Sequence, residues 1–212
     1  MAGGNYDGLR REYNREAGRY DRRWSAYVER TTGETLRRMP VAENDRILDV
    51  GCGSGVLLQR LAQGTPGAAL SGVDLSGAML AVARRRLGPA VDLRCAAAEE
   101  LPFADGAFDT VVSVSMFHFI RRPEEALREM RRVLAPGGRL VLTDWCADYL
   151  ACRLLDWWLR RVDDGHYRTY GAASLRALLA RTGWAVSRLE RYRIDWFWGL
   201  MTVTAIPGES PS

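Results

Sequence analysis

Three glycines at alternate positions, Gly51, Gly53 and Gly55, follow a short apolar run and precede a helical pattern. Glycine suits a tight turn from strand to helix, because it accepts positive φ and lets a ligand approach the backbone without meeting a Cβ atom. The first amides of a helix point outward without partners and can bind an acidic ligand group. We therefore expect a ligand-binding turn here, with the acid Asp49 just ahead of it.

The spacing of the glycines separates two kinds of nucleotide site. A dinucleotide-binding turn reads G-x-G-x-x-G, but position 56 is Val56, so that pattern fails by one residue. The observed pattern, acid-x-Gly-x-Gly-x-Gly, resembles the first motif of the class I S-adenosylmethionine-dependent methyltransferases. A turn with a purely structural role is the alternative that these residues alone leave open.

A second acid, Asp74, ends the next apolar run, residues 69–73. A carboxylate at the end of a second strand can accept hydrogen bonds from both hydroxyls of a nucleoside ribose. Ser76 is a suitable N-cap for the helix that follows. In the family that the segment resembles, the residue after this acid and a later methionine pack against the nucleoside, which implies that role for Leu75 and Met79.

The resemblance continues through Glu99 and the run 101–103. The family usually carries an acid two positions before Glu99, where it accepts a hydrogen bond from the adenine amino group. This chain has Ala97 there. The departure leaves adenine recognition to backbone groups near Ala98 and to Glu99.

The resemblance covers about residues 40–145 motif by motif and implies S-adenosylmethionine as cofactor, with S-adenosylhomocysteine as product. Asp49 and the amides of Gly51–Gly53 would hold the methionine part, Tyr20 would reach its carboxylate, and Ser115 would lie beside the sulfonium. The implied cofactor-binding residues are Tyr20, Asp49, Gly51, Cys52, Gly53, Asp74, Leu75, Met79, Ala98, Glu99 and Ser115.

Methyl transfer from a sulfonium asks mainly that the acceptor be held in line, since the methyl group is already activated. A general base is needed only for a hydroxyl or a protonated amine. His118, which follows a strand end, is the first candidate for that base, and His166 is the second. For each, a hydrogen-bonded structural histidine is the competing interpretation.

Positioning these residues requires an open sheet with its strand ends at one edge. Apolar runs predict strands at 47–50, 69–73, 91–95 and 108–114, and the segment 135–144 is expected to supply a turn and a fifth strand; helical patterns alternate with them. The last two strands, 184–195 and 199–207, are joined too closely to be parallel. We expect an α/β fold: a Rossmann-like, seven-stranded, mostly parallel sheet with a C-terminal antiparallel β-hairpin, helices on both faces and an N-terminal helical lid.

The N-terminal segment, residues 1–39, shows apolar and aromatic residues at helical spacing. We expect it to break at Thr31–Gly33 and to end before Pro40. It is either a lid over the cofactor turn or a docking helix without ligand contact. The expected division of the single domain is lid 1–39, cofactor-binding core 40–144, variable substrate-cover segment 145–170, and helix with closing hairpin 171–207.

The segment 145–170 is rich in tryptophan and departs from the common scaffold. In the family it often covers the substrate pocket, whereas the alternative is a helix whose tryptophans fill the core. A membrane-surface helix is disfavoured, because Arg153 and Asp156 flank the aromatics without a dense basic face.

Length and composition set broad limits. The 212 residues suffice for one domain. No apolar run reaches the ~18–20 residues of a membrane span, and the N-terminus lacks a secretory signal, so we expect a cytoplasmic protein. The four cysteines have no metal-ligand spacing, which predicts free thiols and no metal.

Charge does not point to nucleic acid. All 30 basic residues are arginine, the net charge is only +4, and the arginines are dispersed along the chain. The expected partner is a small-molecule acceptor, partly apolar or aromatic, and the oligomeric state is not legible. Two other classes stay open: a protein that binds S-adenosylmethionine without transfer, and an NAD(P)-dependent oxidoreductase, which Val56 and the closing hairpin disfavour.

Overall fold

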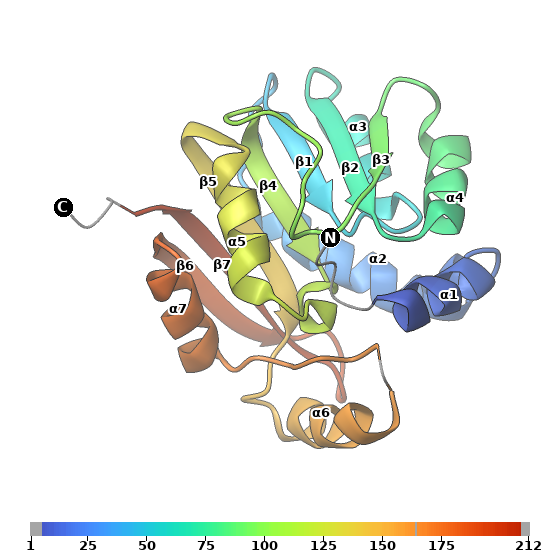
Figure 1. Ribbon diagram of the computed structural model, residues 1–212, viewed down its shortest axis with the longest axis vertical. Coiled ribbons are helices and arrows are strands. Elements are labelled where there is room, and N and C mark those ends of the chain that lie inside the picture. The colour runs from blue at the N-terminus through green and yellow to red at the C-terminus, as the bar shows by residue number, and fades with distance from the viewer. Residues whose placement is uncertain (1–5, 164, 209–212) are drawn as a thin grey trace.

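A computed structural model describes residues 6–163 and 165–208. Seven strands form one sheet in the order β3-β2-β1-β4-β5-β7-β6 (Figure 1). They are β1 Arg46–Val50, β2 Ala69–Asp74, β3 Asp92–Cys95, β4 Phe108–Val114, β5 Leu134–Trp145, β6 Trp184–Arg193 and β7 Gly199–Pro207. β7 alone runs antiparallel to its neighbours β5 and β6. The predicted sheet and closing hairpin are confirmed.

Helices cover both faces of this sheet, as Figure 1 shows. One buried cluster joins the sheet to α3 and α4, and a second joins the opposite face to α5 and α7. The helices are α1 Asp7–Glu16, α2 Tyr20–Arg38, α3 Val56–Gly64, α4 Gly77–Leu87, η1 Phe117–Phe119 (a 3₁₀ turn), α5 Pro123–Arg132, α6 Leu150–Val162 and α7 Ala172–Arg181.

The central strands are apolar on both sides because both sides are covered. Successive side chains of a strand point to opposite faces. Ile47 and Leu48 accordingly enter different buried clusters, as do Val112 and Val111 in the neighbouring strand. The chain order reverses between β1 and β4, and ligands of open α/β sheets bind in the crevice at such a point.

The break expected at Thr31–Gly33 is wrong. α2 runs unbroken from Tyr20 to Arg38, and the interruption lies between α1 and α2 instead. Thr31 and Thr35 are buried, and the Thr35 hydroxyl lies 2.9 Å from the Thr31 carbonyl oxygen. Threonine has a low intrinsic helix propensity, and tertiary packing outweighs that propensity here.

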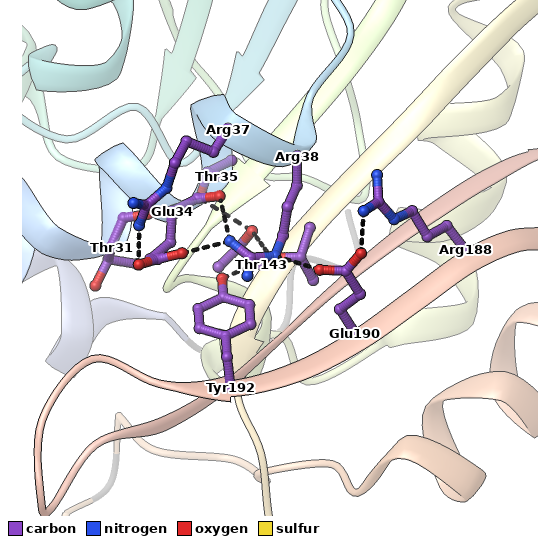
Figure 2. A network of polar contacts seen from close by, with 10 residues as sticks. Thr31, Glu34, Thr35, Arg37, Arg38, Thr143, Arg188, Glu190 and Tyr192 are labelled. Atoms are coloured by element: carbon purple, nitrogen blue, oxygen red, sulfur yellow. Dashed lines mark hydrogen bonds and ion pairs between the residues drawn. The ribbon is translucent and has the colours of Figure 1, made fainter.

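Polar contacts dock α2 onto the half of the sheet that contains β5, β6 and β7 (Figure 2). Hydroxyl groups form a buried chain in which Thr35 lies 3.0 Å from Thr143, Thr143 2.8 Å from Thr202, and Thr202 2.7 Å from Tyr192. Above it, the Arg38 guanidinium lies 3.8 Å from the centre of the Tyr192 ring. This network fixes the helix to β5, β6 and β7.

The tryptophan-rich segment contains α6, and two of its tryptophans do not fill the core. Trp157 and Trp158 are 57% and 52% exposed, so the core-filling interpretation is wrong for both. Within the described ranges, no helix is long and apolar enough to cross a membrane.

Candidate functional site

A cleft of about 1100 Å³, part of it open to solvent, lies where the carboxyl ends of β1, β2 and β4 meet α1 and α2. Its size is that of a nucleotide-scale ligand site. Eleven predicted cofactor-binding residues line it: Tyr20, Asp49, Gly51, Cys52, Gly53, Asp74, Leu75, Met79, Ala98, Glu99 and Ser115. The topology brings these positions together because each follows or ends a strand of the same sheet edge, or faces that edge from the N-terminal helices.

The glycine turn has the geometry that its sequence predicts. Gly51, Gly53 and Gly55 have φ angles of 80°, 52° and 81°. A Cβ atom on Gly51 would collide with Cγ of Met116, so any other residue at this position would displace the Met116 side chain. The turn is held to β2 because the amides of Gly51 and Cys52 both donate to the Val73 carbonyl oxygen, at 2.8 and 2.9 Å.

Asp74 joins the glycine turn to the next helix. Its two carboxylate oxygens accept from the backbone amides of Gly53 and Ser76, each at 2.8 Å. Burial raises the pKa of Asp74, and the two amide donors oppose that rise. Ser76 caps α4 as predicted, by accepting from the Met79 amide at 3.1 Å.

Asp49 is buried at the floor of the cleft, 2% exposed. No donor among the described residues makes a hydrogen bond to its carboxylate. Burial, and then the nearby charge of Asp74, raise the pKa of Asp49 to about 8. An uncompensated buried carboxyl beside a second acid suits a cationic ligand group.

Ser115, at the end of β4, has a φ of 53°, the sole positive φ outside glycine in the described ranges. Its hydroxyl lies 2.7 Å from the Tyr27 hydroxyl, which also accepts from the Trp145 ring N–H at 2.7 Å. Backbone strain of this kind is kept where the surroundings enforce it, commonly at functional sites.

Tyrosines from the N-terminal helices form much of one cleft wall. Tyr6, Tyr13, Tyr20 and Tyr27 recur every seven residues, and all four line the cleft. Burial raises the pKa of Tyr20 to about 12. Of these four, only Tyr20 was predicted from the sequence to bind the cofactor; the seven-residue spacing is the signal that points to the others.

The segment expected to meet adenine lies at one end of the cleft. Ala98 and Glu99 line it, while Ala97 is not among its lining residues. Tyr6 donates its hydroxyl hydrogen to Glu99 and accepts from the Arg121 amide at 2.9 Å. Glu99 is thus oriented by a residue of the N-terminal segment.

Two further contacts hold the N-terminal helices on the cofactor turn. The Asn14 side-chain oxygen accepts from the Ser76 hydroxyl at 2.7 Å and from the Ala78 amide at 3.2 Å. Asp21 accepts from the Ser54 hydroxyl and from Arg86, each at 2.5 Å. Residues of both helices therefore reach the cleft or its turn.

Neither predicted catalytic histidine lines the cleft. His118 is 2% exposed; its Nδ1 lies 2.7 Å from the Asp144 carboxylate, and its ring stacks on Trp145 at 4.1 Å. His166 is also buried, with its Nε2 2.8 Å from the Asp156 carboxylate. Burial lowers the pKa of His166. His118 Nε2 and His166 Nδ1 have no hydrogen-bond partner among the described residues.

Within residues 6–163 and 165–208, no three histidine, cysteine or acidic side chains gather in a way that could hold a metal ion. The four cysteines are free thiols.

Comparison with known proteins gives this cleft a family context. A family model described as a methyltransferase domain matches residues 48–142. The malonyl-[acyl-carrier protein] O-methyltransferase of Geobacter sulfurreducens is 41% identical over 135 residues, which are 61% of this chain and 50% of that protein. The demethylmenaquinone methyltransferase of Thermus thermophilus is 46% identical over 103 residues, 47% of each chain. The chain thus spans about half the length of these curated relatives.

Solved structures share the whole fold. A methyltransferase from Haloferax volcanii, solved in complex with the activator Trm112, has a TM-score of 0.81 at 22% identity and covers 99% of this chain and 100% of that one. A structure of DhpI with S-adenosylhomocysteine has a TM-score of 0.75 at 20% identity, with the same coverage. The likeness extends over the N-terminal helices and the closing hairpin.

Proposed function

We propose that this protein, whose residues 48–142 match the methyltransferase domain model, transfers a methyl group from S-adenosylmethionine to a small molecule. The observation that carries the proposal is the cleft at the sheet's reversal point, with Asp74 bonded to the glycine turn and Asp49 left without a donor. The antiparallel β7 also differs from the parallel six-stranded sheet of dinucleotide-binding proteins.

The chemistry of the cleft fits the proposed cofactor. Two buried acids, Asp49 and Asp74, favour a ligand that carries ammonium and sulfonium charges. The absence of a Cβ at Gly53 lets the methionine part lie close to the backbone there, whereas the space beside Gly51 is taken by Met116. We assign the ribose to Asp74, whose carboxylate oxygens keep further acceptor capacity beyond the two amides.

Adenine recognition is assigned to Ala98 and Glu99, with Leu75 and Met79 beside the ring. Because Ala97 removes the family's usual acid, we propose that Glu99 takes that role with Tyr6 holding it in place. The Tyr6 hydroxyl itself accepts from the Arg121 amide, so the group that contacts Glu99 is held in place by the backbone.

Bound S-adenosylmethionine supplies an already activated methyl group. The residues of the chain have to position the acceptor and exclude water, a contribution worth up to roughly 7–11 kcal/mol. Ser115 and Tyr27 form the cleft wall where the end of β4 meets α2, and the Trp145 ring N–H donates to the Tyr27 hydroxyl. We place the reacting centre against this wall.

The acceptor is proposed to be a partly apolar or aromatic small molecule, and the methylated atom is left open among oxygen, nitrogen and carbon. The curated relatives named above act on a malonyl carrier protein and on demethylmenaquinone. The aromatic wall of Tyr13, Tyr20 and Phe119 suits an apolar ring.

The proposal is tested by binding and turnover measured separately. Titration calorimetry should show S-adenosylhomocysteine binding to the wild type, and a panel of small phenols, quinones and carboxylic acids should yield S-adenosylhomocysteine from S-adenosylmethionine. An absence of S-adenosylhomocysteine binding would remove the proposal. Binding without turnover on any acceptor would instead favour a non-catalytic binding protein.

His118 stays a predicted catalytic residue, and His166 a second one. Asp144 holds Nδ1 of His118, which leaves Nε2 as the free ring nitrogen, but that nitrogen is buried outside the cleft lining. Those contacts favour a structural role for the ring. His118→Ala that keeps near-normal turnover with the true acceptor, at unchanged S-adenosylhomocysteine affinity, would end the catalytic assignment.

A further inference from the structure

Helix α6 turns apolar side chains outward. Five of them are each between 52% and 58% exposed: Leu150, Leu154, Trp157, Trp158 and Val162. They recur at three- and four-residue spacing and therefore share one face of the helix. Single exposed apolar residues are common on proteins, but a contiguous face that includes two tryptophans marks a surface that meets something apolar.

Three of the four charged side chains of α6 are arginines. Arg153, Arg160 and Arg161 are exposed, and the Arg161 guanidinium lies 4.0 Å from the centre of the Trp157 ring. The single acid within α6, Asp156, is mostly buried: its Oδ1 lies 2.8 Å from His166 Nε2 and 2.6 Å from the Thr169 amide nitrogen, and its Oδ2 lies 3.9 Å from Arg160. The sequence disfavoured a membrane-surface helix because Arg153 and Asp156 flank the aromatics without a dense basic face; in the structure Asp156 is mostly buried, which leaves the arginines as the exposed charges of α6.

A second exposed aromatic lies at the same end of the molecule. Trp196, in the β6–β7 turn, is 84% exposed. Gly199, where β7 begins, accepts from the Cys152 thiol of α6 at 3.2 Å, so the turn and α6 adjoin. Figure 1 shows α6 at the periphery of the molecule, beyond the edge of the sheet.

We propose that α6 docks this protein on an anionic lipid surface. Tryptophan and leucine on one side of a helix, with arginines beside them, are the features of helices that lie in a membrane interface. Five half-exposed side chains present roughly 500 Å², whereas a stable protein interface needs about 800 Å² from each partner. The face also belongs to a single projecting helix, which a planar surface accommodates without a complementary groove.

The docking end adjoins the candidate site. The segment after α6 carries His166, whose ring lies 5.9 Å from that of Trp145. Trp145 in turn donates to Tyr27 in the cleft wall. The inference does not depend on methyl transfer, because it rests on the exposed face and its charges alone.

Vesicle flotation tests the proposal. The wild type should float with vesicles of phosphatidylcholine and phosphatidylglycerol in a 3:1 ratio, and at least tenfold less with pure phosphatidylcholine. Trp157→Ser with Trp158→Ser should reduce the floated fraction at least tenfold. Arg153→Gln with Arg160→Gln should remove the preference for the anionic lipid, and raising the salt concentration should weaken wild-type binding.

Matched controls replace exposed residues elsewhere. Trp24→Ser on α2 and Arg128→Gln with Arg176→Gln should float like the wild type, since these side chains are exposed but lie outside α6. Light scattering supplies the competing outcome. A wild-type dimer that the double tryptophan variant converts to monomer, without vesicle binding by either, would overturn the lipid proposal in favour of a second copy. Equal flotation with both lipid mixtures would overturn it as well.

Discussion

Asp74 is the residue whose replacement should affect ligand binding most directly. Asp74→Asn places an amide donor against the amide of Gly53 or Ser76, both of which now donate to the carboxylate. It also removes the charged acceptor that we propose for the ribose, and such hydrogen bonds contribute about 1.5–3 kcal/mol. We expect S-adenosylhomocysteine to bind roughly 10- to 150-fold more weakly by calorimetry. Asp92→Asn, an exposed acid in the adjoining strand β3, serves as control and should leave the affinity unchanged.

Asp49 should make the ligand-free protein less stable as pH rises. The pKa of Asp49 is raised to about 8 by burial, against about 3.9 in an unfolded chain. Below about pH 4 the carboxyl is protonated in both states. Between about pH 4 and 8 it is ionised only when unfolded, so the unfolded state binds fewer protons and the free energy of unfolding falls with pH.

The measurement is urea unfolding of wild type and Asp49→Asn at pH 4.5, 6 and 7.5. As pH increases, the free energy of unfolding of the wild type should fall steadily relative to that of Asp49→Asn. Asp109 has the opposite sign, because its hydrogen bonds to Arg46 lower its pKa to about 2. Asp109 is largely ionised in both the folded and the unfolded state above pH 4.5, so Asp109→Asn should leave the slope between pH 4.5 and 7.5 unchanged. Parallel curves for wild type and Asp49→Asn would contradict the buried-carboxyl argument.

At the scale of residues, the sequence located the acids and glycines that end strands, because those positions are set by local turns. It missed Asn14 and Tyr27, which act through contacts with residues distant in the chain. Spacing within a helix shows which side is apolar. It does not show which hydroxyl or amide group will meet a partner from another element.

Among the elements, α2 depends on its hydroxyl chain. Thr35→Val keeps the shape of the side chain but removes the group that contacts both Thr31 and Thr143. Thr143 would keep Thr202 as a partner, so we expect a loss of about 1–2 kcal/mol in the free energy of unfolding. Urea unfolding measures the loss. Ser187→Ala, a hydroxyl on the exposed outer strand β6, should change the free energy by less than about 0.5 kcal/mol.

The elements also show where sequence patterns mislead. Strand β4 was bounded correctly because its apolar run is flanked by turn residues. Helix α2 was predicted to break at Thr31–Gly33 because those residues are poor helix formers, yet their burial against the sheet outweighs that preference. For α6, helical spacing correctly indicated an apolar face, but periodicity alone cannot tell whether such a face meets a core or a surface.

Over the whole molecule, the sheet order follows from rules that the sequence engages directly. Alternating strands and helices require parallel strands with crossovers, and the short link between the last two strands requires an antiparallel pair. The position of the N-terminal helices over the cleft has no such rule behind it. It comes from side-chain contacts such as those of Asn14 and Asp21, which only the folded chain brings together.

The fold and the cleft together predict which nucleoside stabilises the protein. A ligand at 100 times its dissociation constant adds about 2.7 kcal/mol to the free energy of unfolding. For a domain of this length, each kcal/mol raises Tm by roughly 2–4 °C. We therefore expect S-adenosylhomocysteine to raise Tm by roughly 5–11 °C, while NAD and NADP leave it unchanged because Val56 stands where a dinucleotide turn needs glycine. Asp74→Asn should lose most of the shift, and the double variant of Trp157 and Trp158, which lie outside the cleft lining, should keep it. A rise with NAD and none with S-adenosylhomocysteine would contradict both the ribose assignment and the reaction proposed from it.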